Sequence, residues 1–255
     1  MKRLFAAALL AAIPFLASAT TYSTDVTDLW SISSESGWGV NFIQQDDTLF
    51  ATLFVYGADG KPAWYVAPQM APPASGSLTF TGDLYATTGP WFGGAFDPAS
   101  VGVRKVGTAT FTLDSVTEGT FTYGVDGVNV TKHVVRQLWR YDLISGTYVG
   151  ALSGTASGCG QGLDGYSETP ITVVIAQDAA NNVALSESAA GGSTCNYTGT
   201  YSQAGRMGRI LGSGGCGDID AGEVQTTIAG ITLRLVASRS GSSCRFVGSI
   251  AGTRR

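Results

Sequence analysis

Acid–base or nucleophilic chemistry in this chain of 255 residues would depend on its one histidine, His133. A Ser-His-Asp or Cys-His site would have to use it. No G-x-S-x-G sequence, which would present a serine on a sharp strand–helix turn, is present. His133 alternates with the polar residues Asn129, Thr131 and Gln137, so we interpret it as an exposed strand residue. We therefore assign no catalytic residue and no cofactor.

Paired carboxylates offer a second chemistry, because glycoside hydrolysis uses two acids about 5–9 Å apart. Glu35 and Asp83 are the candidates. Most other acids fall in expected turns, where a carboxylate bonds the local backbone; these are Asp46, Asp47, Asp59, Asp97 and Asp126. The glycine-rich stretch 212–217 lacks the Lys-Ser/Thr ending of a phosphate-binding loop. A glycosidase is the last-ranked of three functions that we consider.

Two cations share the apolar side of one expected strand, Val128 to Leu138. Lys132 and Arg136 have the parity of Val130 and Val134 in that strand. If this side lines a barrel, the cations need carboxylate partners or an anionic ligand, because unpaired buried charge is costly. Glu35, in the sequence Ser34-Glu35-Ser36-Gly37-Trp38, is the partner we expect. A bulge that inverts the phase, or side chains that extend from the barrel mouth to solvent, are the alternatives.

Aromatic side chains are the other binding candidates. Trp38, Trp64, Tyr65 and Trp91 could stack on sugar rings or line an apolar pocket at a barrel mouth. Core packing is the default interpretation of Trp38 and Trp64. Trp91 follows the turn-like stretch 87–90 and is expected to be exposed. With Glu35, Lys132 and Arg136, these residues form the candidate ligand-binding set.

The four cysteines indicate two disulfides rather than a metal site, since no C-x-x-C pair occurs. A two-residue turn with glycine first, Gly205-Arg206, places Cys195 opposite Cys216 across a hairpin. That position is a non-hydrogen-bonded pair with a Cα separation of about 4.5 Å, close enough for a disulfide. Cys159 and Cys244 then pair by elimination.

Composition favours an all-β protein, because Gly, Thr, Ser and Val dominate and no segment has a convincing helical period. Asp-Gly turns are expected at Asp59-Gly60 and Asp126-Gly127, each of type I′ between two strands. We predict seven strands in the first half, beginning at 38–44, and seven in the second, including a single strand at 225–236. The strands are short and Thr-rich, which argues against an outer-membrane barrel.

Two domains are predicted, because all five tryptophans precede residue 142 and all four cysteines follow it. We expect an aromatic-rich β domain at 20–141 and a disulfide-bonded β domain at 142–255. Each is an antiparallel up-and-down barrel or a sandwich. One large barrel is the alternative.

Residues 1–19 have the pattern of a secretory signal peptide: Lys2 and Arg3, an apolar run, then Ala17-Ser18-Ala19. The run is too short to span a membrane. Cleavage after Ala19 removes two cations and no acid, so the net charge changes from −4 to −6. An acidic chain without a basic cluster is a poor nucleic-acid binder. We expect a secreted or periplasmic monomer.

Several segments resemble a family of uncharacterised exported proteins from Gram-negative bacteria. They include 28–30, the Glu35-Ser36-Gly37-Trp38-Gly39 module with 40–41, 49–57, 64–65, 84–85, 88–90, 125–127, Lys132, 136–137, 195–201, 205–206 and 252–254. The resemblance covers most of the chain after residue 19 and implies export, but no activity.

The leading hypothesis is a non-catalytic exported protein whose first domain binds a small or glycan-like ligand. A structural or cell-surface interaction protein is the second; it predicts a barrel interior filled by side chains and an exposed apolar patch.

Overall fold

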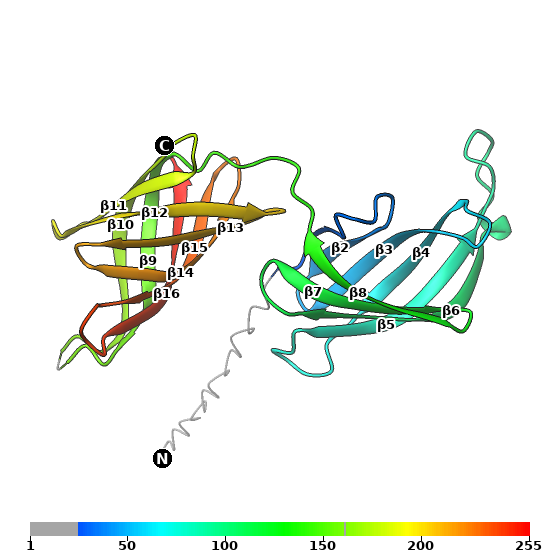
Figure 1. Ribbon diagram of the computed structural model, residues 1–255, viewed down its shortest axis with the longest axis horizontal. Helices are drawn as coiled ribbons and strands as arrows, with labels where there is room; N and C mark the ends of the chain where they lie inside the picture. Colours follow the sequence, from blue (N-terminus) through cyan, green and yellow to red (C-terminus); the bar gives the residue numbers. More distant parts are fainter. Residues whose placement is uncertain (1–24, 161) are drawn as a thin grey trace, which may run out of the picture.

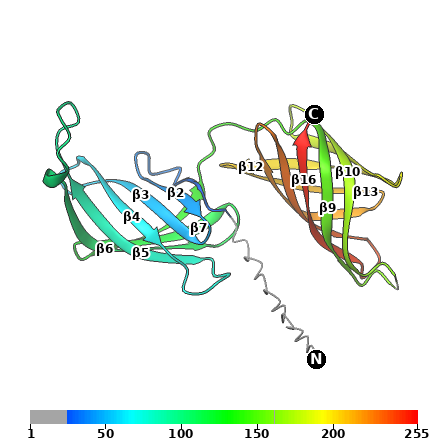
Figure 2. The same cartoon turned by 180° about the vertical axis from the view of Figure 1, so that it is seen from behind.

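The chain forms two closed eight-stranded antiparallel barrels joined by a short linker (Figures 1 and 2). The structure, a computed structural model, describes residues 25–160 and 162–255. The all-β, two-barrel prediction is confirmed, and the single large barrel is wrong. The predicted signal peptide lies outside the described residues. Within the described part of the chain, no helix is both long and apolar enough to cross a membrane.

The first barrel is a meander in which each strand pairs with the next and the last pairs with the first. Closure joins Trp30 to Arg136 and Ser31 to Val135. A 3-10 helix, η1 (Pro98–Ser100), lies in the long β5–β6 loop. The strands are β1 (Asp28–Ser31), β2 (Gly39–Gln45), β3 (Thr48–Tyr56), β4 (Pro62–Met70), β5 (Thr79–Thr88), β6 (Gly102–Leu113), β7 (Glu118–Val125) and β8 (Val128–Arg136).

The second barrel repeats this order and closes through a long β9–β16 ladder, from Arg245 opposite Ser157 to Arg254 opposite Tyr148. Its strands are β9 (Gly146–Ser157), β10 (Gly165–Gln177), β11 (Asn182–Ala189), β12 (Thr194–Ala204), β13 (Met207–Gly214), β14 (Gly217–Thr226), β15 (Gly230–Ser238) and β16 (Arg245–Arg254).

One strand of each barrel differs from the prediction. The first barrel begins with β1, which has only four residues, and not with the strand at 38–44. In the second barrel, the single strand expected at 225–236 is the end of β14, a turn, and β15. β14 contains two glycines and three acids and has a bulge opposite β15, so its sequence has low intrinsic strand preference. Its two neighbouring strands supply the hydrogen bonds that hold it.

The turns decide the register of several hairpins. Asp126 and Gly127 have φ of 48° and 87°, the two positive values of the predicted type I′ turn. The other predicted type I′ turn is wrong, because Gly60 alone has positive φ in that loop and the Gly57 amide bonds the carbonyl of Lys61. The loop is longer than two residues, and the glycine closes it.

Aromatic rings fill the first barrel. Trp30 and Phe111 have ring centroids 5.0 Å apart, and Phe42 lies 4.6 Å from Phe111 and 5.8 Å from Phe121. These side chains are fully buried. The outer wall of β5–β8 is instead polar, with threonine hydroxyls paired across neighbouring strands.

The predicted inward side of β8 is confirmed for its central residues. Val134 and Arg136 are buried and Lys132 is partly buried, while His133 is exposed. Val128 is exposed because it starts the strand, and β8 ends at Arg136 rather than at Leu138. Gln137 leaves the ladder to donate its amide to the Leu29 carbonyl.

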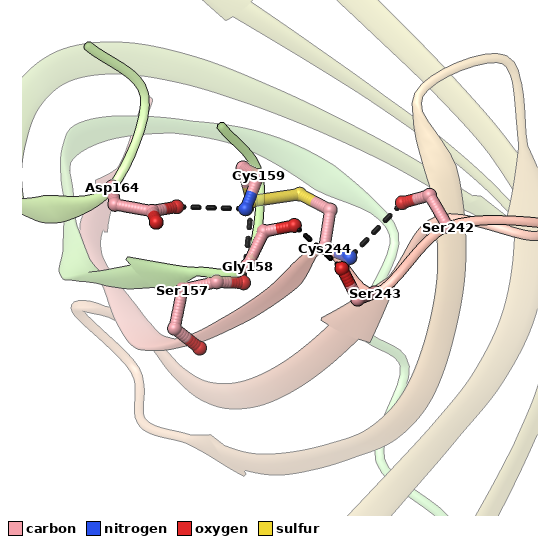
Figure 3. The surroundings of a disulfide bond; sticks show 7 residues. All are labelled: Ser157, Gly158, Cys159, Asp164, Ser242, Ser243 and Cys244. Carbon is pink, nitrogen blue, oxygen red and sulfur yellow. Dashed lines mark hydrogen bonds between the residues drawn. A yellow bond between two sulfur atoms is a disulfide. The ribbon is translucent and has the colours of Figure 1, made fainter. Parts of the chain in front are cut away.

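Two disulfides crosslink the second barrel, Cys159–Cys244 and Cys195–Cys216. The first joins the β9–β10 and β15–β16 loops beside the closing ladder (Figure 3). The second has a Cα separation of 5.6 Å, wider than expected. The β12–β13 ladder ends at Tyr197 and Gly214, so both cysteines lie beyond it: Cys195 is still in β12, opposite Glu187 of β11, and Cys216 is in the β13–β14 turn.

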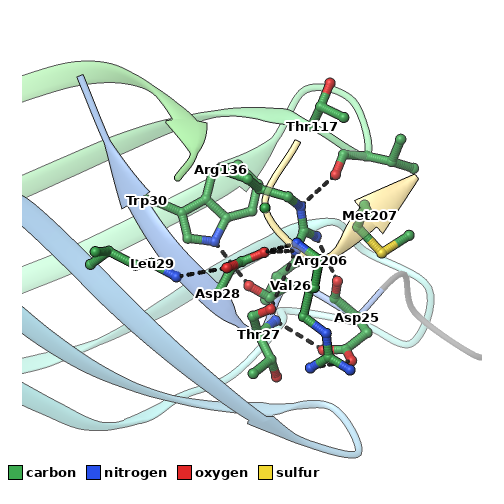
Figure 4. A network of polar contacts seen from close by, with 12 residues as sticks. Asp25, Val26, Thr27, Asp28, Leu29, Trp30, Thr117, Arg136, Arg206 and Met207 are labelled. Atoms are coloured by element: carbon green, nitrogen blue, oxygen red, sulfur yellow. Dashed lines mark hydrogen bonds and ion pairs between the residues drawn. The ribbon is translucent and has the colours of Figure 1, made fainter. Parts of the chain in front are cut away.

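The two barrels touch through the β12–β13 hairpin, whose turn lies against the start of the first barrel (Figure 4). Gly205 has φ of 54°, as a type II′ turn requires. The Arg206 amide donates to Asp28 Oδ2 at 2.9 Å, and its guanidinium lies 3.4 Å from Asp25 Oδ2. Asp28 also pairs with the buried Arg136, so one carboxylate serves both barrels.

Candidate functional site

The β1–β2 loop, residues 32–38, borders an open pocket of about 440 Å³ on the first barrel. Two successive turns shape this loop, because the Glu35 amide bonds Ile32 and the Trp38 amide bonds Glu35. Gly37 has φ of 90°, and a Cβ there would collide with Tyr56. The pocket, called the loop pocket here, is lined by Leu29, Ser31, Ile32, Ser33, Glu35, Ser36, Gly37, Trp38, Gly39, Phe54, Gln137 and Trp139.

Glu35 forms an ion pair with Lys132, whose side chain points into the barrel mouth from β8. The Lys132 Nζ lies 2.7 Å from Oε1 and 2.6 Å from Oε2 of Glu35. It also lies 5.8 Å from the centroid of the Trp38 ring. The expected partnership of Glu35 with a β8 cation therefore holds for Lys132. Lys132 thus balances the charge of the carboxylate that lines the pocket.

Trp38 lines the loop pocket and also packs against the core of the first barrel. Its Nε1 donates to the Tyr123 hydroxyl at 3.2 Å, and the two rings stack at 6.4 Å. Partly buried, it packs against the aromatic core. One side of Trp38 thus belongs to the core and another to the pocket wall, so the two interpretations of this residue are compatible.

Exposed aromatic rings border the pocket on its outer side. Trp139, in the linker, is 77% exposed and lines the pocket beside Phe54 of β3. Phe54 lies directly opposite Trp64 of β4, and both point outward. We call Phe54, Trp64 and Trp139 the aromatic surface. Phe54 and Trp139 are not among the residues predicted from sequence; the shared parity of Phe54 with Phe50 and polar Thr52 is the signal that indicates its outward position.

Polar side chains lie beside these rings. Ser31 Oγ donates to Gln137 Oε1 at 2.7 Å, and both residues line the pocket. Ser33, Ser36 and Glu35 add hydroxyl and carboxylate groups from the loop. The pocket therefore combines flat apolar faces with several hydrogen-bonding groups.

Of the seven predicted site residues, Glu35 and Trp38 line the loop pocket, and Lys132 and Trp64 are next to lining residues. The other three lie elsewhere. Tyr65 is partly buried and packs against the core. Trp91 lies in the β5–β6 loop and does not line the loop pocket. Arg136, at the C-terminal end of β8, is 2% exposed and faces the core, where it stacks on Trp30 with its guanidinium carbon 4.6 Å from the ring centroid.

Arg136 is held by the start of the chain's first barrel and not by Glu35, which corrects the expected pairing. Its guanidinium donates to Asp28 Oδ2 and to the carbonyls of Asp25, Thr27 and Val116 (Figure 4). Burial lowers the pKa of Arg136, and the Asp28 carboxylate opposes this shift. Arg136 is thus a satisfied structural cation.

The acid and base candidates do not converge. His133 is exposed, with ring nitrogens 3.7 Å from Asp114 and 3.8 Å from Glu118, on the outer wall. Asp83 pairs with Lys105. Of the described residues that line the loop pocket, Glu35 is the sole carboxylate, and the described residues contain no cluster of His, Cys, Asp and Glu suited to a metal ion.

Comparisons with known proteins add little to this geometry. No protein-family model matches the chain, and no curated protein matches it. The resemblance to an exported family therefore stays a prediction. A solved structure from Bacteroides fragilis, described as a "putative outer membrane protein", aligns with 91% of this chain and 98% of its own. The identity is 14% and the TM-score is 0.30.

Proposed function

We propose that this protein is an exported, non-catalytic carbohydrate-binding protein that holds a neutral sugar in the loop pocket of its first barrel. The observation that carries the proposal is the exposed Trp139 and Phe54 pair beside Gln137, Ser33 and Glu35. The pocket volume of about 440 Å³ falls in the range of small-molecule sites.

Sugar rings have apolar C–H faces and polar edges, so they need flat apolar surface and hydrogen-bonding groups together. The indole of Trp139 offers such a face with little conformational entropy to lose. Gln137, Ser33 and Ser36 can donate and accept hydrogen bonds at its edge. Lys132 balances the Glu35 carboxylate, which favours a neutral ligand over a cation or an anion.

Binding is favoured over hydrolysis by the charge of the site. Glycoside cleavage requires two carboxyl groups with different roles. The loop pocket offers one, and its ion pair with Lys132 already occupies both of its oxygens. Two disulfides support export, because such bonds persist in oxidising compartments.

The proposal is tested by screening the protein on an array of neutral glycans and measuring the affinity of hits by calorimetry. Trp139→Ala should weaken binding at least tenfold, a loss of about 1.4 kcal/mol, because the stacking face is removed. Trp91→Ala is the matched control, an exposed tryptophan outside the pocket, and should bind normally. Absence of any glycan hit, or equal affinity of the Trp139→Ala variant, would overturn the proposal.

A cell-surface interaction protein is the second candidate, and the filled interior of the first barrel favours it. The outer wall of β2–β4 also exposes Ile43 opposite Phe50, and Phe54 opposite Trp64. This candidate predicts that Phe50→Ser and Ile43→Ser abolish capture of a protein partner. Sugar binding in the loop pocket would be unaffected by those changes.

A further inference from the structure

The β5–β6 loop, residues 89–101, exposes three aromatic side chains that the loop pocket does not use. Trp91 is 71% exposed, Phe92 95% and Phe96 72%. Figure 1 shows this loop standing clear of the strands at one end of the first barrel. Large aromatics exposed together on a loop tip mark an interaction site, because their contact with water is unfavourable.

The loop has a defined shape that keeps these rings outside. The Gly94 amide bonds the Trp91 carbonyl, and the Trp91 and Phe92 rings lie 5.7 Å apart. A Cβ at Gly93 would lie 2.4 Å from the Trp91 ring. Asp97 accepts the Ala99 amide and thereby caps η1 at the base of the loop.

Charge is nearly absent from the β5–β6 loop. From Leu84 to Val103 the chain contains a single charged residue, Asp97. The first cations below the loop are already paired: Arg104 with Asp126 at 2.6 Å and Lys105 with Asp83 at 2.7 Å. The tip is therefore apolar, and the zone behind it carries balanced charge of both signs.

We propose that the tip of the β5–β6 loop inserts into the surface of a lipid bilayer and binds zwitterionic lipid without need of anionic headgroups. The tip projects, and its three rings line none of the pockets described among residues 25–160 and 162–255, so it fits a deformable apolar phase better than a small ligand. Tryptophan and phenylalanine are suited to the boundary between headgroups and acyl chains. Balanced ion pairs behind the tip give no electrostatic attraction to anionic lipids, unlike a polybasic segment.

The test is flotation of the full exported protein with two kinds of vesicle: phosphatidylcholine alone, and phosphatidylcholine partly replaced by phosphatidylglycerol. We expect equal binding to both, little change with salt, and a blue shift of tryptophan fluorescence. The variant Trp91→Ser, Phe92→Ser, Phe96→Ser should lose at least tenfold of the vesicle binding. Trp139→Ser, which changes an equally exposed tryptophan in the loop pocket, should retain it.

Several results would overturn the proposal. These are no binding to phosphatidylcholine vesicles, equal binding by the triple variant, or binding only to anionic vesicles with loss in high salt. A dimer in gel filtration that the triple variant abolishes would assign the loop to a second copy of the chain instead. Because this site and the loop pocket have separate variants, failure of one proposal leaves the other intact.

Discussion

At the scale of single residues, the first barrel places one inward cation at the middle of β8, Lys132, and one at its end, Arg136, and satisfies each differently. Lys132 meets Glu35 at a mouth where the carboxylate is still partly in water, so this pair contributes little net stability. Arg136 is buried and has four oxygen partners. Removing any one of them would leave a buried charge less satisfied, which is the costly case.

Glu187 of β11 is a partly buried carboxylate whose neutral form is favoured by the fold. It shares strand parity with the buried Val183 and Leu185, and burial raises its pKa above that of an ordinary glutamate. Burial, followed by the charge of Glu187, also raises the pKa of Tyr197. The folded chain therefore holds the Glu187 proton more tightly than the unfolded chain does.

The expected consequence is a stability that falls as pH rises from the ordinary glutamate pKa to the raised folded value. Above that range the loss of folding stability caused by ionised Glu187 stays constant. Glu187→Gln should therefore raise the melting temperature of the second barrel at pH 7 and have little effect below the ordinary pKa. Circular dichroism melts of both proteins across this pH range measure it. A constant difference at all pH values would contradict the argument.

At the scale of elements, the disulfides stabilise the second barrel through different lengths of chain. Cys159 and Cys244 are 85 residues apart in the sequence, and their disulfide joins two loops beside the strands that close the barrel. Cys195–Cys216 spans 21 residues within one hairpin and its turn. In the chain-entropy account, the longer loop restricts the unfolded chain more, by about 4–5 kcal/mol against about 3 kcal/mol.

We expect the Cys159→Ser, Cys244→Ser variant to lose more stability than the Cys195→Ser, Cys216→Ser variant. Urea unfolding followed by circular dichroism compares them. Tryptophan fluorescence is the internal control, since all five tryptophans precede the second barrel, and it should report unchanged unfolding of the first. Equal losses from the two variants would show that loop length does not govern the effect.

At the scale of the whole molecule, one turn holds the barrels together. A Cβ at Gly205 would lie 2.1 Å from Asp28 Oδ2 and 2.8 Å from the Arg136 Cβ. The positive φ of Gly205 allows the tight hairpin turn, and the absence of a side chain there allows the other barrel to approach. The contact is small and polar, so its geometry depends on this close approach.

Gly205→Ala should separate the barrels and increase the radius of gyration measured by small-angle X-ray scattering. Gly127→Ala is the matched control. Gly127 also has positive φ in a hairpin turn, but a Cβ there meets nothing within 4 Å. Both variants should lose some stability from backbone strain, and only Gly205→Ala should change the scattering profile. Identical profiles for the two variants would mean that the contact does not set the arrangement.

The sequence alone determined the features that depend on neighbouring residues. Period-two alternation identified most strands and the inward side of β8, and glycine positions identified the turns at 126–127 and 205–206. The second turn also led to the pairing of Cys195 with Cys216. These features follow from backbone geometry over a few residues, which the chain carries wherever it folds.

Only the tertiary structure decided which distant groups meet. Glu35 and Lys132 are 97 residues apart and Asp28 and Arg136 are 108 apart, and barrel closure brings each pair together. Trp139 lies outside every strand, so no periodicity could place it beside Phe54. The physical reason is that closure of the whole barrel decides which distant residues become neighbours. The positions of strands and turns depend instead on local backbone preference.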